Sequence, residues 1–306
     1  MPQDTFDLHQ EELDYLQKLG FATNFLNSSA NNLEEIWEKA MEIKTQKENL
    51  NYPIDGLVIK LNDNNLIQKL GVVGKTPRGW AAVKFAAQEV TTKIWQVAWQ
   101  VGRTGKITPV AELEPVELNG TLVKRATLHN YKEFLEDNLA KNDTLVIRKA
   151  GEIIPEVIKV LENLKPENPE FFAAPKICPS CSSELKLSGT EVDLVCLNSE
   201  NCPNQILGRL TYYTQRNLAS ITGLSDKILE KFCDLYGVKD VPDLYKLPYD
   251  KIRELEGFGE KSVENIQKSV EKASQIPAHK FLAGLAVEGV GIEGARLIVD
   301  YLFLRA

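Results

Sequence analysis

The chain has 306 residues and a formal net charge of −7 at pH 7. That length predicts two or more domains. No apolar run is long enough to span a bilayer and Met1-Pro2-Gln3-Asp4 is unlike a secretory leader, so a cytoplasmic protein without a membrane partner is expected. Acidic and basic residues balance over 87–165 and again over 208–306, which excludes a bulk basic patch. Any contact with nucleic acid must therefore come from local lysines and backbone amides.

The first 86 residues are expected to combine helices with two short strands. Residues 7–50 show the apolar spacing of helices, with a capping pair at Asn31-Asn32. Short apolar runs bounded by Gly and Pro then predict strands over 54–61 and 80–85.

Each of these two strands carries a lysine near its end, Lys60 in the first and Lys84 in the second. Alternation along the first strand puts Lys60 on the face opposite Leu57 and Ile59. Two converging lysines would suit a nucleotide phosphate, because a compact ammonium group stabilises charge that develops during phosphoryl transfer. For either lysine alone, a solvated strand end is the alternative.

Residues 87–165 are rich in short apolar runs separated by glycines. About five short strands and one helix over 131–138 suit a small Greek-key barrel of the OB type, although composition does not exclude another small barrel. The strands are predicted over 90–101, 107–113, 116–125, 144–149 and 155–161.

A polar linker with prolines, residues 162–170, leads into four cysteines spaced C-x2-C-x14-C-x5-C. Two close thiol pairs at this spacing predict one tetrahedral Zn²⁺ site, which is structural because no ligand position is left for water. A segment this short and polar needs such a staple to fold. Two disulfides or four separate core thiols are the alternatives. The predicted ligands are Cys178, Cys181, Cys196 and Cys202.

From residue 208 the chain becomes helical and repetitive. Three glycine turns begin at Gly223, Gly257 and Gly289, at intervals of 34 and 32 residues, and each precedes an apolar-periodic helix. This pattern predicts helix-hairpin-helix units, in which glycine permits positive φ and the next helix turns its free amides toward a DNA phosphate. The first copy has Ser225 in place of a second glycine and is expected to serve packing. The predicted phosphate contacts, which carry no base readout, are Gly257, Gly259, Lys261, Gly289 and Gly291.

The remaining reactive side chains are assigned to structure. His9, His129 and His279 are scattered and are expected to be structural or exposed, and no spacing of Asp and Glu marks an acid–base pair. Cys233 falls on an apolar helical stripe with Phe232, so core packing is expected for it.

Four segments, followed by the cysteines and hairpins, resemble bacterial NAD⁺-dependent DNA ligase in their order. Ile-Asp-Gly-Leu-Val-Ile-Lys at 54–60 and Trp-Ala-Ala-Val-Lys-Phe at 80–85 look like nucleotidyltransferase motifs IV and V. Val-Gly-Arg-Thr-Gly-Lys-Ile-Thr-Pro-Val at 101–110 and Lys-Ala-Gly-Glu-Ile-Ile-Pro at 149–155 come next. The resemblance implies a multidomain α+β protein. Its parts would be the C-terminal part of an adenylation (nucleotidyltransferase) domain over 1–86, an OB-fold β-barrel over 87–165, a linker and four-cysteine zinc finger over 166–207, and an all-α helix-hairpin-helix array over 208–306.

The resemblance also implies an activity, the sealing of nicks in duplex DNA during replication and repair. A lysine would take AMP from NAD⁺ and release nicotinamide mononucleotide. The adenylyl group would then pass to the 5′-phosphate, and the 3′-hydroxyl would displace AMP, with Mg²⁺ or Mn²⁺ assisting. Lys60 and Lys84 match the lysines that contact the adenylate. Arg103 and Thr104 would touch DNA near the nick. A monomer acting on nicked duplexes independently of sequence is expected.

One departure from the family is important. The nucleophilic lysine belongs to a Lys-x-Asp-Gly motif, and this tetrapeptide does not occur in the sequence, so no catalytic residue is assigned. A segment that docks the nicotinamide half of NAD⁺ and a fourth hairpin are not found either. The chain is therefore expected not to adenylate itself from NAD⁺. The alternative function is a non-catalytic, zinc-stabilised module that binds DNA.

Overall fold

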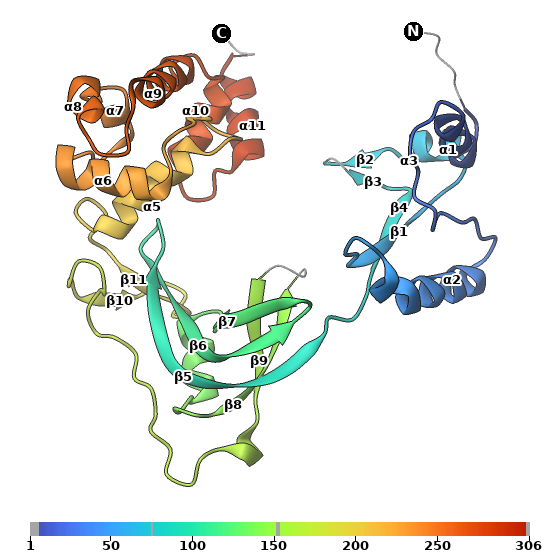
Figure 1. The fold of residues 1–306 in the computed structure, drawn as a ribbon, viewed down its shortest axis with the longest axis horizontal. Coiled ribbons are helices and arrows are strands. Elements are labelled where there is room, and N and C mark those ends of the chain that lie inside the picture. Colours follow the sequence, from blue (N-terminus) through green and yellow to red (C-terminus); the bar gives the residue numbers. More distant parts are fainter. Residues whose placement is uncertain (1–5, 75, 151–153, 304–306) are drawn as a thin grey trace. The chain divides into compact units, whose positions relative to one another are not determined.

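A computed structural model describes residues 6–74, 76–150 and 154–303, which form two compact units. Unit 1 comprises Met1–Gln88 with Lys149–Ile154, and unit 2 comprises Glu89–Arg148 with Pro155–Ala306 (Figure 1). Within the described ranges, every helix is too short or too polar to cross a bilayer.

Unit 1 begins with two helices, as the apolar spacing predicts. They are α1 (His9–Lys18) and α2 (Leu33–Gln46). The Asn32 side chain accepts a hydrogen bond of 2.8 Å from the Glu35 amide, which confirms the predicted cap. A 3-10 turn (Lys47–Asn49) follows α2. A further helix that was not predicted, α3 (Asn64–Leu70), lies between the two main strands in the sequence.

The two predicted strands of unit 1 form an antiparallel pair, β1 (Gly56–Lys60) and β4 (Trp80–Lys84). A short hairpin, β2 (Val72–Val73) with β3 (Thr76–Pro77), separates them in the sequence. Ala40 is the only buried hydrophobic residue among the described residues of this unit. Unit 1 therefore holds its apolar side chains at partly exposed positions.

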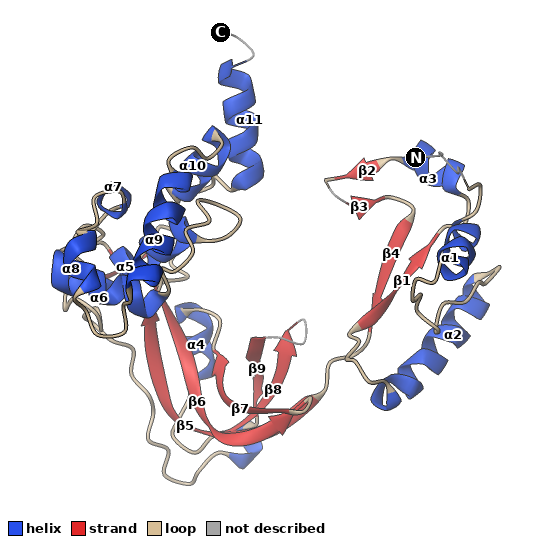
Figure 2. Cartoon of the chain, turned by 45° about the horizontal axis from the view of Figure 1, so that its top comes forward, coloured by secondary structure: helices blue, strands red, loops and turns tan. Residues whose placement is uncertain are grey.

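Unit 2 contains a closed five-stranded barrel, which confirms the OB prediction (Figure 2). Strand β6 pairs with β5 and β7, β5 pairs with β8, and β9 closes the ring between β8 and β7. The β7–β9 pairing is parallel and the others with a printed register are antiparallel. The elements are β5 (Glu89–Val101), β6 (Lys106–Leu118), β7 (Thr121–Thr127), α4 (Tyr131–Asp137), β8 (Thr144–Ala150) and β9 (Ile154–Val160), followed by a 3-10 turn (Glu162–Leu164).

The prediction of one strand over 116–125 was wrong. Asn119 and Gly120 adopt φ of 50° and 67°, the left-handed region that a two-residue hairpin turn requires. β6 therefore continues to Leu118, and the chain reverses into β7. An Asn-Gly pair between two apolar runs outweighs their combined strand propensity, because its geometry matches the twist of the flanking strands.

Strand β5 pairs with two neighbouring strands, and its register against β6 shifts between Ile94 and Gln96. Its first half pairs with β8 and its second half with β6. Such a bulge bends a strand sharply and lets a small barrel close. Ile94, Leu118 and Phe134 are buried in the barrel core, with Phe134 from α4 against the edge of Trp99.

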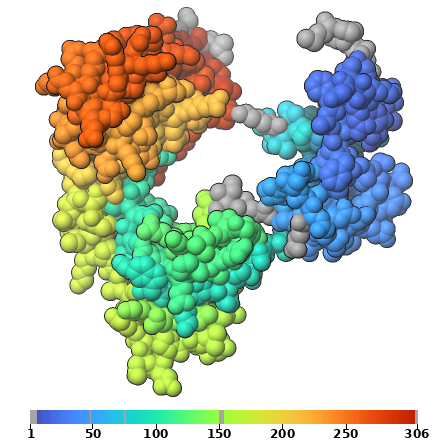
Figure 3. Space-filling view, in the orientation of Figure 1, coloured from blue at the N-terminus to red at the C-terminus, as the bar shows by residue number. Residues whose placement is uncertain are grey.

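The cysteine module, residues 171–207, adds two short strands to the barrel sheet. β10 (Leu185–Leu187) pairs with β11 (Leu194–Cys196), and β11 pairs with the start of β6. Seven strands thus form one continuous sheet, and the module lies against the barrel rather than apart from it (Figure 3).

Residues 208–303 form a helical array with its own core. Three pairs of helices follow one another, each joined by one of the glycine turns and each in contact, α5 with α6, α8 with α9, and α10 with α11. Leu210, Phe232, Ile252 and Ile266 are buried in the main cluster, and half-buried Cys233 packs on it as predicted. The helices are α5 (Pro203–Thr214), α6 (Asp226–Tyr236), α7 (Val241–Leu244), α8 (Tyr249–Arg253), α9 (Glu260–Ala273), α10 (Ala278–Gly284) and α11 (Ile292–Phe303).

Candidate functional site

The four predicted zinc ligands lie together. The sulfur atoms of Cys178, Cys181, Cys196 and Cys202 are all within 4.8 Å of one another. Cys181 lies 3.5 Å from Cys196, and Cys178 lies 4.0 Å from Cys202, between sulfur atoms. A tetrahedral Zn²⁺ with bonds of 2.3 Å separates its sulfur ligands by about 3.8 Å, so the cluster fits this ion. All four thiols are free, and the disulfide alternative is not what the structure holds.

Three separate elements bring these sulfurs to one point. Cys178 and Cys181 share a tight turn, in which the Ser182 amide donates to the Cys178 carbonyl at 2.9 Å. Cys196 ends β11, and Cys202 caps the start of α5, with a proline at the first helical position. The site therefore joins the cysteine module to the first helix of the helical array.

The surroundings of the cluster control how readily its thiols ionise. Burial raises the pKa of Cys178, and it raises the pKa of Cys196 to about 12. Burial opposes ionisation of Cys181 as well, but hydrogen bonds with Ser183, Cys196 and Cys178 together outweigh it and bring the pKa to about 6. Burial therefore disfavours four thiolates side by side, and a bound divalent cation would stabilise them.

The strand lysines of unit 1 share one face but do not converge. In the antiparallel register Lys60 lies opposite Trp80, and Lys84 lies opposite Gly56. Both side chains point to the face that carries Val58 and Ala82, here called the lysine face. Four strand positions separate the lysines, which is about 13 Å along the ribbon. Each lysine therefore has its own surroundings.

Lys60 has partners that sequence reasoning missed. Its ammonium nitrogen lies 4.4 Å from the centre of the Trp80 ring and 3.4 Å from His9 Nε2. The other ring nitrogen of His9 lies 2.7 Å from a Glu12 carboxylate oxygen. His9 was assigned to structure or surface, and no motif marks it. It reaches Lys60 because its amide donates to the Asn62 carbonyl just beyond β1.

Lys84 forms an ion pair with Asp55, the residue that precedes β1. The hydrogen bond from Lys84 lowers the pKa of the Asp55 carboxyl group below its ordinary value. Both side chains are exposed, so this pair is open to a ligand that brings its own phosphate or cation. The position of Asp55 directly before Gly56 in the segment 54–60 is the sequence feature that could have indicated it.

The second and third hairpins of the helical array are open at their glycines. Gly257 and Gly289 adopt φ of 88° and 77°, which only glycine reaches without strain. A methyl group added at Gly257, Gly259, Gly289 or Gly291 would meet no atom within 4 Å, so the backbone there is accessible. Gly259 caps α9, and Lys261 is exposed in its first turn, as predicted.

The first hairpin is packed, which confirms the expectation for that copy. A methyl group at Gly223 would come within 2.8 Å of Ile266 on α9. The Thr222 amide also donates to Ser269 Oγ of the same helix at 2.8 Å. Its backbone is therefore used inside the fold rather than offered to a ligand.

The barrel turn, residues 102–105, connects β5 to β6 and carries the two predicted DNA contacts. Thr104 is exposed. Arg103 is half-buried, with its guanidinium carbon 4.1 Å from the centre of the Tyr212 ring on α5. The other barrel segment of the ligase resemblance, residues 149–155, includes residues 151–153, which lie outside the described residues.

The remaining predictions for reactive side chains also have structural answers. His129 Nε2 lies 2.9 Å from the Val157 carbonyl oxygen, so its ring contacts the barrel backbone, as expected.

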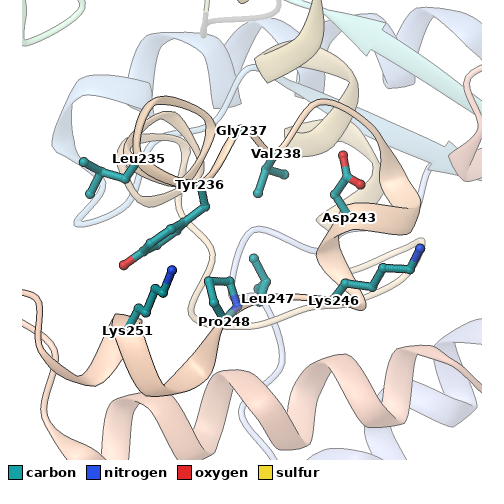
Figure 4. A pocket seen from close by; sticks show the side chains of 9 residues that line it. All are labelled: Leu235, Tyr236, Gly237, Val238, Asp243, Lys246, Leu247, Pro248 and Lys251. Carbon is teal, nitrogen blue, oxygen red and sulfur yellow. The ribbon is translucent and has the colours of Figure 1, made fainter.

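A cleft of about 380 Å³ lies beside α6, lined in part by Tyr236, Lys246 and Lys251 (Figure 4). It contains no member of the cysteine cluster, the lysine face or the open hairpins.

Two family models match consecutive stretches of this chain. Residues 2–88 match the NAD-dependent DNA ligase adenylation domain, and residues 91–169 match the NAD-dependent DNA ligase OB-fold domain. A DNA ligase of Bacillus cereus (strain AH820) is 38% identical over 299 residues, which cover 98% of this chain. The chain belongs to the NAD-dependent DNA ligase family.

Family membership places the lysine face in the ligase adenylation domain and the barrel turn in the ligase OB domain. The similarity to the Bacillus cereus ligase also extends over the cysteine module and the helical array, which neither model covers. The chain spans 44% of the length of that relative.

Proposed function

We propose that this chain acts in an NAD⁺-dependent DNA ligase that seals nicks between 3′-hydroxyl and 5′-phosphate ends. The observation that carries the proposal is the combination, in one ligase-family chain, of an exposed lysine face in an adenylation-domain match with two open glycine hairpins. The first is suited to a nucleotide, and the second to the phosphates of duplex DNA.

On the lysine face, a nucleotide would lie along the ribbon with one lysine near each end. Lys84 would neutralise phosphate charge, exchanging its bond to Asp55 for the phosphate oxygens. Lys60, which lies over the Trp80 ring and next to His9, would contact the other end of the adenylate. The amine that receives AMP would come from a Lys-x-Asp-Gly motif that this sequence does not contain.

The DNA would be held by backbone amides of the second and third hairpins, with Lys261 adding charge. Thr104 of the barrel turn would lie near the nick. These contacts address phosphates, so binding would be independent of sequence. The protein would act as a cytoplasmic monomer.

Two metals belong to the proposal. Zn²⁺ would be held by the four thiolates and would fold the cysteine module without taking part in the chemistry. Mg²⁺ or Mn²⁺ would neutralise phosphate charge during transfer. The phosphates of the nucleotide and of the DNA would be the ligands of this second metal.

The decisive experiment supplies a nicked duplex whose 5′ end already carries AMP and measures sealing with Mg²⁺. This step bypasses self-adenylation but still needs the lysine face. Lys60→Ala and Lys84→Ala are expected to slow sealing on the order of 100-fold, the size of a lost charge-stabilising group. Lys69→Ala, an exposed lysine on α3, is the matched control. Equal rates for all three variants would contradict the role of the lysine face.

The second candidate function, a DNA-binding module without catalysis, is favoured by the missing Lys-x-Asp-Gly tetrapeptide. It predicts binding to the adenylated nick without sealing. Incubation with labelled NAD⁺ is expected to leave no covalent AMP on this polypeptide under either function. A labelled polypeptide would show that another residue of this chain is the nucleophile.

A further inference from the structure

Three different parts of unit 2 meet at the barrel turn. On one side a methyl group at Gly105, whose φ is 82°, would overlap the carbonyl oxygen of Cys196. On the other side a methyl group at Gly208 of α5 would come within 2.8 Å of Arg103 Cβ. Two glycines thus permit the close approach of barrel, cysteine module and helical array at this turn.

Arg103 is the residue of the turn whose side chain lies along α5. Its backbone lies on Gly208, and its guanidinium group lies over the Tyr212 ring, one helical turn further along. Arginine suits this position because its planar guanidinium group stacks on an aromatic face and leaves the N–H groups at its edge free to donate hydrogen bonds.

Tyr212 continues the contact into the last helix-hairpin-helix unit. It packs against the cluster of Leu218, Ala283 and Ala295, which belongs to α5's C-terminal loop, α10 and α11. Val290, between the two glycines of the third hairpin, packs on the same cluster. An unbroken row of side chains therefore leads from the barrel turn to the open backbone of that hairpin.

The cysteine module supports the turn from behind. The Gln205 side-chain amide donates to the Cys196 carbonyl at 3.0 Å, and the Cys196 amide donates to the Gly105 carbonyl at 2.9 Å. Lys106, next in the chain, forms an ion pair of 2.9 Å with Asp193. These two hydrogen bonds and the ion pair connect the turn to the cysteine module and to the start of α5.

We propose that Arg103 is a positioning residue. Through Tyr212 it holds α5 and the third hairpin on the barrel, so that the barrel and the hairpin engage one duplex together. The consequence for affinity rests on the proposed function, because it assumes that both surfaces bind DNA. Two linked contacts bind far more tightly than either alone only when their geometry allows simultaneous engagement.

The contact of Arg103 with Gly208 and Tyr212 is here called the joint. The test compares variants that disturb the joint with and without removing a charge. Gly208→Ala removes no group that could touch DNA, yet its new methyl group pushes against Arg103. Arg103→Ala, Tyr212→Leu and Gly208→Ala are each expected to weaken binding to a nicked duplex roughly tenfold, as when one of two linked contacts is misplaced. The double variant Arg103→Ala with Tyr212→Leu is expected to be no weaker than the single variants. Gly189→Ala, where a methyl group meets open space, is the control.

A second measurement follows the joint without DNA. Spin labels on unnatural residues at Leu122 of β7 and Leu297 of α11, both exposed, report the distance between barrel and array. Each joint variant is expected to broaden the distance distribution, and Arg103→Lys, which keeps a cation over the ring, is expected to restore part of it. Zinc content and the melting curve confirm that the variants are folded.

Direct contact of Arg103 with DNA makes a different set of predictions. Arg103→Ala alone would then weaken binding, Gly208→Ala and Tyr212→Leu would bind like the unaltered protein, and no distance would change. That result would overturn the positioning role, and so would additive losses in the double variant. If the unaltered protein ignores nicked duplexes while the variants still broaden the distance distribution, the proposed function fails and the positioning role stands.

Discussion

The two units of this chain differ in how they bury apolar side chains. Unit 2 has continuous buried clusters in the barrel, the cysteine module and the helical array. In unit 1, Leu33 and Trp37 on α2 stay 76% and 62% exposed, and Ala40 is the single buried hydrophobic residue among those described. Unit 2 therefore has the means to fold independently, whereas the strand pair of unit 1 has little packing to stabilise it.

Removal of zinc should have the largest effect, confined to unit 2. Structural zinc sites contribute on the order of 10 kcal/mol to folding, and the cysteine module has only a small apolar core of its own. Chelation, or Cys196→Ser, is expected to abolish amide protection over 171–207 and to weaken DNA binding, while unit 1 keeps its exchange pattern. Hydrogen exchange before and after chelation measures this. Unchanged protection would show that β11 pairing with β6 suffices without the metal.

A core truncation in each unit should come next. Phe232→Ala empties a fully buried position in the helical array and is expected to cost about 3–5 kcal/mol. Trp37→Ala removes a mostly exposed ring in unit 1 and is expected to cost less than about 1 kcal/mol. Urea denaturation of both variants tests the contrast. A large loss for Trp37→Ala would mean that this ring is covered in solution.

Substitution of two hairpin glycines in unit 2 should distinguish a glycine needed for stability from one needed for DNA binding. Gly223→Ala meets both a positive φ and Ile266, so it is expected to lower stability by about 2 kcal/mol or more. Gly257→Ala meets only the positive φ, at a cost of about 1–2 kcal/mol, but it places a methyl group where a phosphate would approach. Melting and DNA titration distinguish the two. Gly257→Ala that binds like the unaltered protein would argue against phosphate contact at the second hairpin.

The smallest effect should come from the exposed ion pair of unit 1. Lys84 lowers the pKa of Asp55, so Asp55 keeps its charge to a lower pH than an isolated carboxyl group. Any stability from the pair is present above the unfolded pKa and is lost as pH falls through the lowered one. Lys84→Met is expected to return the pKa of Asp55 to the ordinary range without a measurable change in stability. An NMR titration of the Asp55 carboxyl carbon follows this, and an unmoved pKa would mean that the pair does not form in solution.

Local signals in the sequence were sufficient for much of the fold. The cap at Asn32, the strands at 54–61 and 80–85 and the small barrel follow from residue patterns that act over a few positions. The cysteine spacing predicted, for the same reason, four thiols gathered where they could hold a metal ion, since ligand type and spacing limit which ion can bind. The division into four domains at 86, 165 and 207 stays a prediction.

By itself, the sequence determined most of the main elements, the ligase family and which residues could bind a metal or a phosphate. Only the tertiary structure decided which of them meet. It separated Lys60 from Lys84 along one face, brought His9 to Lys60, packed the first hairpin on α9 and placed Arg103 on Tyr212. The physical reason is that strand register and helix packing depend on contacts between residues distant in the sequence, which no local pattern encodes.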